Sequence, residues 1–240
     1  MDNRADTGGR WRYEYPKIII IAMSKLEFNS KDIQGFEQRY RARFINSLGG
    51  YKSLSLIGTR SRAGNTNLAL FNSFFHIGAN PPLFGFIVRP DGVERHTLSN
   101  ILETSIFTVN HVREDFYVAA HQTSARYEGN VSEFAAVGLT EEFKPGYYAP
   151  FVAESGVKIG AAFRQRIDIA QNGTVMILAE IKYVSIPEGS LEEDGYIDLE
   201  TAGTVTCSGL DSYHRTERIG RLTYAKPDTL PQHINKPGIE

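Results

Sequence analysis

The chain has 240 residues, of which 41% are hydrophobic, enough to bury the core of one large domain or two small ones. Its 26 Lys and Arg residues against 28 Asp and Glu residues leave a charge of −2, so no strong field attracts a nucleic acid or an acidic membrane. Its one cysteine, Cys207, excludes an intrachain disulfide framework and a Cys-rich zinc site, and favours a reducing, cytoplasmic location.

The N-terminal residues 1–22 differ in character from the rest. The segment 17–23 contains an apolar run that is far shorter than the roughly 20 residues that a membrane span needs. No small-residue cleavage site of a signal peptide follows it. We expect residues 1–22 to be a non-native or disordered extension, Met23 to be the native initiator, and residues 23–240 to form a single domain. The intact mass of the protein from its natural host tests the start site.

The first half of the chain predicts one helix followed by strands. Apolar residues recur at three- and four-residue spacing from a candidate N-cap, Ser30, to Leu48, where two glycines stop the pattern. Residues 52–59 and 66–75 are β-like and flank a turn-prone segment, which predicts a hairpin. After two prolines, the continuous apolar run 83–88 is typical of a buried strand.

The second half predicts a short helix, a helical middle and a return to strands. Thr97 begins a short amphipathic helix, residues 107–112 form a strand, and residues 114–139 read as helical with polar interruptions. Residues 157–169 and 174–186 flank an Asn-Gly step, the strongest hairpin signal in the chain. The order is not a regular βαβ alternation and lacks a Gly-rich dinucleotide fingerprint, so the pattern favours a mainly β barrel with peripheral helices over a Rossmann fold.

Polar residues cluster around the start of the short helix. Thr97 and Asn100 lie three apart, on one face of its first turn, where free N–H groups and the helix dipole favour an anion. Arg89 and Arg95 are close in sequence, and a guanidinium binds phosphate oxygens through paired hydrogen bonds. The pattern fits a phosphate site, although Thr97 as a plain N-cap and the arginines as solvated loop charges fit it too.

Several motifs together resemble one known family. The segments are residues 65–75, 80–86 and 95–101, then Phe107-Thr108-Val109-Asn110-His111, Ser132-Glu133-Phe134, Gly138-Leu139, Val152-Ala153-Glu154-Ser155 and Gly209-Leu210-Asp211-Ser212-Tyr213-His214. In order and spacing they resemble the flavin reductase-like, FMN-binding split-barrel family over about residues 30–228. The resemblance implies a split β-barrel of Greek-key type and a homodimer that holds FMN non-covalently at its interface.

The resemblance also implies roles for individual residues. The strand at 66–75 would run along the isoalloxazine ring, and Arg89, Arg95, His96, Thr97 and Asn100 would surround the phosphate. The ring-side candidates are Thr66, Asn67, Phe71, Asn72 and Ser73. Alternation along the strand leaves open which of them face the flavin. Asn72 and Ser73 could instead satisfy backbone groups at the end of the barrel.

Histidine and cysteine chemistry receives less support. None of the six histidines has ligand spacing with a carboxylate or a second histidine on one helix face, so we expect no metal site. His214 would lie near the open face of the flavin and contact nicotinamide, or else pack near the dimer interface. Many relatives carry an aromatic residue in its place, which is the main departure from the family pattern. Cys207 reads as a small buried side chain.

The resemblance implies an FMN-binding oxidoreductase, an NAD(P)H-dependent flavin reductase that transfers hydride from nicotinamide to flavin. FMN is preferred to FAD, NADH or NADPH would be the co-substrate, and a monooxygenase or another redox protein is a candidate partner. The alternative is a flavoredoxin-like electron carrier, reduced by a protein partner. A non-flavin barrel such as an oligonucleotide-binding module is disfavoured, because the strands lack interleaved basic and aromatic residues.

Overall fold

The computed structural model describes residues 24–90 and 95–234. The chain divides into two units, residues 1–35 with 217–240 and residues 36–216, and each is described by itself. The extension expected at residues 1–22 and the candidate initiator Met23 lie outside the described residues. Within the described part, no helix is both long and apolar enough to cross a membrane.

The long helix predicted from Ser30 to Leu48 is two helices, so its predicted continuity is wrong. The first, α1 (Ser30–Gly35), belongs to the smaller unit, and the Asn29 side chain accepts hydrogen bonds from the N–H groups of Lys31 and Asp32. The second, α2 (Gln38–Leu48), starts anew because the Glu37 carboxylate accepts from the N–H groups of Arg39 and Tyr40.

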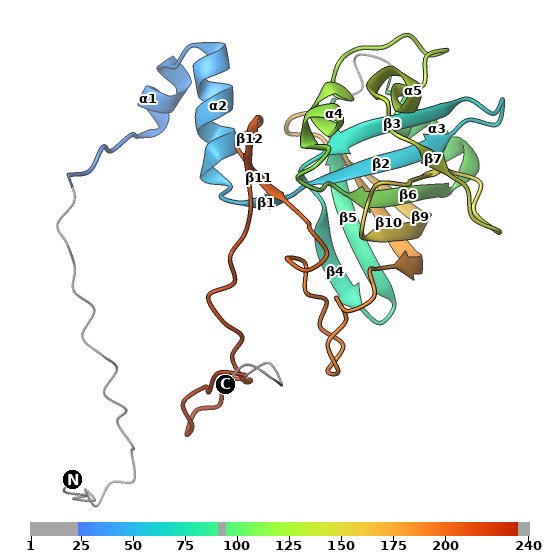
Figure 1. The fold of residues 1–240 in the computed structure, drawn as a ribbon. Coiled ribbons are helices and arrows are strands. Elements are labelled where there is room, and N and C mark those ends of the chain that lie inside the picture. Colours follow the sequence, from blue (N-terminus) through green and yellow to red (C-terminus); the bar gives the residue numbers. More distant parts are fainter. Residues whose placement is uncertain (1–23, 91–94, 235–240) are drawn as a thin grey trace, which may run out of the picture. The chain divides into compact units, whose positions relative to one another are not determined.

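The larger unit contains a seven-stranded antiparallel sheet with the order β3-β2-β6-β9-β10-β5-β4 (Figure 1). Its strands are β2 (Ser55–Arg60), β3 (Thr66–Phe71), β4 (Phe75–Ala79), β5 (Pro82–Val88), β6 (Ile106–His111), β9 (Lys158–Ile169) and β10 (Thr174–Ser185). The predicted hairpins β2–β3 and β9–β10 are both confirmed. The turn of the second places Gly173 at φ 71°, a conformation that glycine adopts without strain.

Shorter elements surround this sheet. They are the three-stranded sheet β1 (Lys52–Ser53), β11 (Thr206–Ser208) and β12 (Ser212–His214), the pair β7 (Glu141–Glu142) and β8 (Phe151–Val152), and the helices α3 (His96–Thr104), α4 (Tyr117–Gln122) and α5 (Glu133–Val137). The predicted strand 66–75 is interrupted, because the chain turns at residues 72–74 and pairs again only as β4. The predicted helical segment 114–139 contains only α4 and α5.

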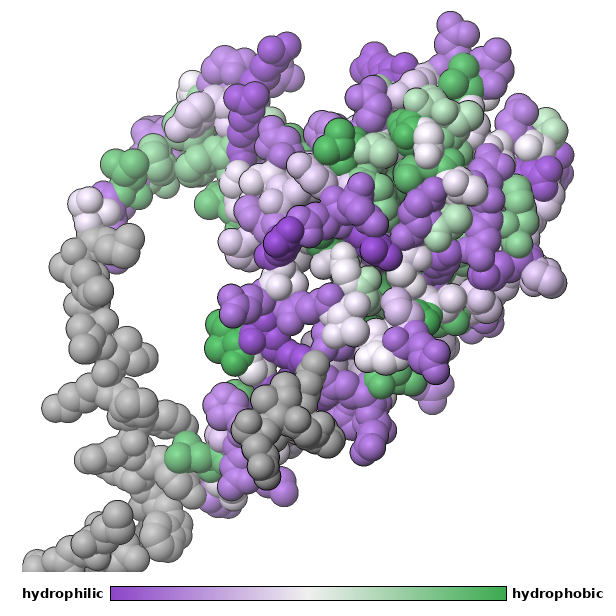
Figure 2. Space-filling view, in the orientation of Figure 1, coloured by the Kyte–Doolittle hydropathy of each residue, from purple (hydrophilic) through white to green (hydrophobic). Residues whose placement is uncertain are grey.

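Two hydrophobic cores cover the two faces of the sheet. Side chains alternate along β2, so Ile57 packs in one core with Phe84, Phe86 and Phe107, while Leu56 packs in the other. α3 contributes Leu98 and Ile101 to the first core, and α4 and α5 contribute Ala120 and Phe134 to the second. The mainly β fold with peripheral helices is therefore confirmed. On the face seen in Figure 2, hydrophilic residues predominate and apolar groups form scattered patches.

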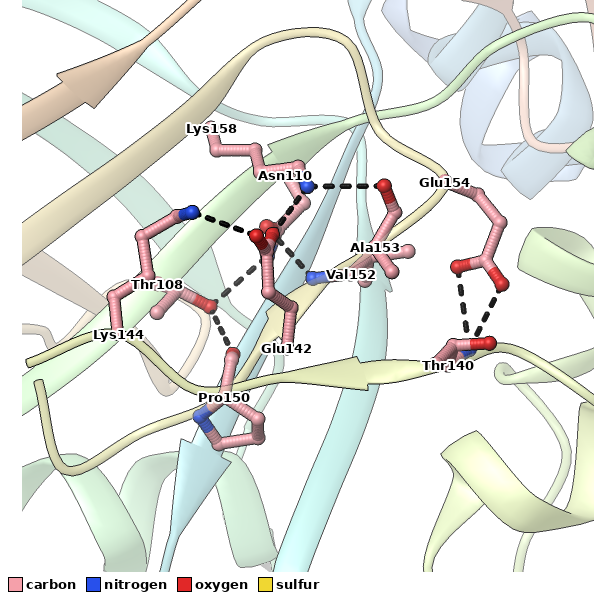
Figure 3. Close-up of polar contacts among 10 residues, drawn as sticks. All are labelled: Thr108, Asn110, Thr140, Glu142, Lys144, Pro150, Val152, Ala153, Glu154 and Lys158. Atoms are coloured by element: carbon pink, nitrogen blue, oxygen red, sulfur yellow. Dashed lines mark hydrogen bonds and ion pairs between the residues drawn. The ribbon is translucent and has the colours of Figure 1, made fainter.

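A buried polar network fastens β8 to the main sheet (Figure 3). On β6, the Asn110 amide donates to the carbonyl of Leu56 at 3.2 Å, and its oxygen accepts from the N–H of Val152 at 3.0 Å. The Thr108 hydroxyl donates to the carbonyl of Pro150 at 2.6 Å. Beside them, the buried Lys158 donates to the Glu142 carboxylate and to the carbonyl of Ala153. These bonds replace a longer strand ladder for this segment.

Candidate functional site

The larger unit holds a cavity of about 610 Å³. Its walls come from β3 and the turn after it, the end of β5, the start of α3, and the segment between α4 and α5. The sequence-predicted residues that line it are Asn67, Phe71, Asn72, Ser73, Arg89, Arg95, His96 and Thr97. The fold therefore gathers residues separated along the chain around one space.

Two polar pairs attach the first turn of α3 to the sheet. The Asn67 amide donates to the Thr97 hydroxyl oxygen at 2.9 Å, and the Asn100 amide donates to the Thr59 hydroxyl oxygen at 3.0 Å. Thr59 and Asn67 are opposite each other on β2 and β3, which matches the spacing of Thr97 and Asn100 on one helix face. Asn100 does not line the cavity. Because Thr97 accepts from Asn67, its own O–H remains available as a donor.

Asn72 and Ser73 line the cavity and also hold its walls together. The Asn72 amide donates to the carbonyl of Gly209 at 3.3 Å, next to Leu210, which is itself a lining residue. The Ser73 hydroxyl donates to the carbonyl of Ile87 at 3.1 Å and accepts from the N–H of the same residue at 3.0 Å. Both side chains thus satisfy backbone groups beyond the end of β3, which is the alternative role that the sequence left open for them.

Positive charge gathers where α3 begins. Arg95 is the N-cap residue of α3, but its side chain makes no capping hydrogen bond. Its Nε is buried without a hydrogen-bond partner, and its Nη2 lies 3.5 Å from the carbonyl of Pro90. Arg89 is exposed at the end of β5 and also lines the cavity. An unpartnered buried N–H beside a helix N-terminus is suited to an anion.

Besides Asn100, two predicted residues do not line the cavity. The Thr66 hydroxyl, at the start of β3, hydrogen bonds with Ser132 and donates to the Glu141 carboxylate, so it links the strand to the segment around α5. His214, on β12, forms a 2.9 Å hydrogen bond through Nε2 with the Ser208 hydroxyl and packs edge-on against the Tyr51 ring. Neither lines the cavity in this chain.

Glu133 is a lining residue that the sequence reasoning did not single out for a role. Its side chain is only 6% exposed, and its carboxylate accepts from the N–H of Leu68 on the outer edge of β3 at 2.9 Å. Burial raises the pKa of this carboxyl, while the hydrogen bond from Leu68 and the nearby His96 act in the opposite direction. Its sequence signal, an acid at the start of a short apolar helix, is common to many helices that bind nothing.

The segment 123–129 is the larger omission. It was expected to be helical, yet the helix ends at Gln122 and the next seven residues line the cavity. The His96 ring packs directly on Gly129, where an added Cβ would lie 3.1 Å from Nε2. Only tertiary contacts bring this segment to α3, and the available sequence signal was its run of polar residues ending at Gly129.

Redox and metal alternatives are limited by the remaining side chains. Cys207 is buried and unbonded to another cysteine, and burial raises the pKa of its thiol. Among residues 24–90 and 95–234, no group of three His, Cys, Asp or Glu side chains is arranged to hold a metal ion. The cavity, with its cationic end, is therefore the candidate site that the geometry favours.

Comparisons with known proteins identify the family of this chain. Residues 52–203 match the family described as flavin reductase like domain. A split-barrel-domain protein of Shewanella frigidimarina, provisionally described as a flavin reductase, is 46% identical, with 84% of this chain and 100% of that chain covered and a TM-score of 0.81.

Two more distant structures share the fold. Nitrilotriacetate monooxygenase component B from Bacillus cereus is 19% identical over 84% of this chain and 100% of its own, with a TM-score of 0.73. Flavoredoxin of Desulfovibrio vulgaris is 22% identical over 74% of this chain and 91% of its own, with a TM-score of 0.62. The family match covers more than half of the chain. The split-barrel fold is thus confirmed, and the chain belongs to the flavin reductase-like family.

Proposed function

We propose that this protein binds FMN in the cavity and works as an NAD(P)H-dependent flavin reductase. The observation that carries the proposal is the arrangement within one cavity of a cationic end, where Arg95 has an unpartnered buried Nε, and a wall of β3 side chains. A phosphorylated ligand with a flat, largely apolar ring would complement both parts. The cavity volume, about 610 Å³, lies within the range common for cofactor sites.

The cationic end fits a terminal phosphate. The first-turn N–H groups of α3, the Thr97 hydroxyl and the guanidinium groups of Arg89 and Arg95 would supply donors and charge. Asn67 fixes the Thr97 hydroxyl by donating to its oxygen. Asn100 contributes to the proposed site indirectly, because it holds the same turn of α3 against Thr59.

The part of the lining that comes from β3 and β5 fits the ring. Ala69 and Phe71 on β3 and Ile87 and Val88 on β5 offer apolar surface, while Asn72 and Ser73 provide polar atoms at its edge. Because those two side chains are hydrogen bonded to the backbone of Gly209 and Ile87, their positions are set by the protein itself rather than by a ligand. In this arrangement the protein binds, orients and shields FMN without a covalent bond between FMN and a side chain.

FMN, when bound, supplies the chemistry, because its ring accepts a hydride from the nicotinamide and passes electrons on. The side chains around the cavity only position the two reactants. A homodimer with the flavin at its interface, a monooxygenase or other redox partner, and a cytoplasmic location remain part of the proposal. Support for a dimer comes from α2, which buries no residue and leaves Tyr40 55% and Leu48 67% exposed.

The deciding experiment is an absorbance spectrum of the purified protein from about 300 to 550 nm, before and after anaerobic addition of NADH and then NADPH. Flavin bands that bleach promptly with a nicotinamide would support the reductase and identify the donor. Flavin bands that neither donor bleaches would favour the electron carrier instead. A colourless protein that takes up no added FMN would overturn the flavoprotein proposal.

The phosphate end has its own test. Arg95→Gln should weaken FMN binding by roughly 10- to 100-fold, the loss expected for a charge-assisted hydrogen bond. The control is Arg62→Gln, which removes an arginine that lies outside the cavity lining and pairs with Glu103 at the surface. Titration of flavin fluorescence gives both dissociation constants, and equal values would contradict the proposed phosphate site.

A further inference from the structure

Arg126 is a cavity-lining arginine that the proposed FMN site does not use. It lies in the segment 123–129 and is exposed. Within the described residues, its guanidinium forms no hydrogen bond or ion pair, unlike Arg62, Arg113, Arg166 and Arg215, each of which pairs with a carboxylate. An arginine kept unpaired at the edge of a cavity is available to a ligand.

The segment that carries Arg126 is held at both of its ends. At the start, Thr123 is 3% exposed and its hydroxyl donates to the carbonyl of Ala120 at 2.8 Å. At the other end, Gly129 packs against the His96 ring, which belongs to the first residue of α3. In addition, the amide of Gln122, the last residue of α4, donates to the Tyr127 hydroxyl at 3.3 Å. The segment that carries Arg126 is therefore attached to the rest of the unit on both sides of this residue.

The charge of Arg126 is not needed to balance the phosphate of FMN. A phosphomonoester carries about −1.5 to −2 charges near neutral pH, which Arg89, Arg95 and the N-terminus of α3 can balance. Of the two lining acids, Glu133 directs its carboxylate to the N–H of Leu68, and Glu128 forms no ion pair with Arg126 in the described part of the chain. Arg126 is therefore available to a second anionic group bound in the cavity.

We propose that Arg126 binds a phosphate of the nicotinamide dinucleotide that donates the hydride, so that the segment 123–129 is the docking element for this second ligand. The inference rests on the proposed function and adds a residue to it. The phosphate is either the 2′-phosphate, found only in NADPH, or the pyrophosphate that both dinucleotides share. A guanidinium recognises either group through paired hydrogen bonds.

The test compares the FMN-loaded protein with Arg126→Gln, Arg126→Lys and the control Arg62→Gln. Steady-state kcat/KM is measured with NADPH and with NADH, and calorimetry measures the binding of adenosine 2′,5′-bisphosphate and of 5′-AMP. In Arg126→Gln we expect kcat/KM for NADPH to fall by roughly 10- to 100-fold, while Arg126→Lys retains part of it. The FMN dissociation constant should stay within about twofold in every variant.

The outcomes separate the two sources of phosphate. A loss confined to NADPH and to adenosine 2′,5′-bisphosphate assigns Arg126 to the 2′-phosphate, whereas equal losses with both dinucleotides assign it to the pyrophosphate. Unchanged kcat/KM with both donors and unchanged binding of both adenosine probes would overturn the inference. That result is distinct from a failure of the proposed function, in which the unsubstituted protein would take up no FMN or would hold FMN that neither dinucleotide reduces.

Discussion

At the scale of single residues, the polar side chains buried in the sheet determine how its loops attach. Asn110 is fully buried and uses both ends of its amide, since it donates to Leu56 and Thr108 and accepts from Val152. The hydrogen bonds of a buried amide add little net stability, because the same groups bond to water in the unfolded chain. Removal of the amide nevertheless leaves buried backbone groups without partners. Asn110 is therefore more costly to lose than its small side chain suggests.

We expect Asn110→Ala to lower the free energy of unfolding by about 2–4 kcal/mol, because the Leu56 carbonyl and the Val152 N–H both lose a buried partner. The matched control is Asn130→Ala, which changes an exposed residue between α4 and α5 and should cost less than about 0.5 kcal/mol. Urea denaturation measures both. Equal costs would show that the network does not support the fold.

At the scale of elements, one glycine allows β8 to approach β2. A Cβ built on Gly58 would lie 2.4 Å from the carbonyl oxygen of Pro150 and 2.6 Å from the Thr108 hydroxyl. No side chain can be accommodated at these distances without moving the backbone. Pro150, which precedes β8, can lie this close to β2 only because residue 58 is a glycine.

Gly58→Ala should destabilise the protein by about 1–3 kcal/mol, since it forces residues 150–152 away from β2. Gly78→Ala on β4 is the control, because its added Cβ would have no neighbour closer than 3.7 Å and its φ is not positive. Thermal unfolding of the two variants compares them directly. A melting temperature that Gly58→Ala leaves unchanged would contradict the close approach.

The sequence predicts elements well where the signal is local. The Asn172-Gly173 turn fixes the β9–β10 hairpin, and the apolar run 83–88 is the buried strand β5. Prediction from the sequence fails where a competing local cap or a tertiary contact determines the structure. Glu37 starts a second helix because its carboxylate accepts from the N–H groups of Arg39 and Tyr40. The segment 123–129 is placed by packing of His96 on Gly129. The same reason applies to the candidate site, where Arg126 follows from that placement rather than from any pattern around it.

At the scale of the whole molecule, the proposed site depends on parts of the chain far apart in sequence. The carbonyl of Gly209 accepts from Asn72 and also from the Lys52 ammonium at 2.7 Å, so one atom connects the turn before β12 to β1 and to the end of β3. Lys52 donates in addition to the carbonyl of Asn46, another lining residue. Movement of this turn would therefore displace residues that line the cavity.

The proposed homodimer has a concentration dependence that can be measured. If the flavin lies at the interface, dilution should release FMN over the same protein concentrations at which the dimer dissociates. Sedimentation velocity follows the mass, and the rise in free flavin fluorescence follows the release. Flavin retained by a fully monomeric protein would show that one chain holds it unaided.

Cys207 gives the protein a natural reporter of its own opening. It is the chain's one cysteine, it is 2% exposed on β11, and burial raises the pKa of its thiol although the Asn72 amide acts in the opposite direction. A thiol reagent can modify it only when β11 is transiently exposed, so the labelling rate reports the opening equilibrium of that region. We expect FMN to slow labelling at least several-fold, because Asn72 lines the cavity, and mass spectrometry of quenched samples gives the rate. An unchanged rate would mean that ligand binding and the motion of β11 are independent.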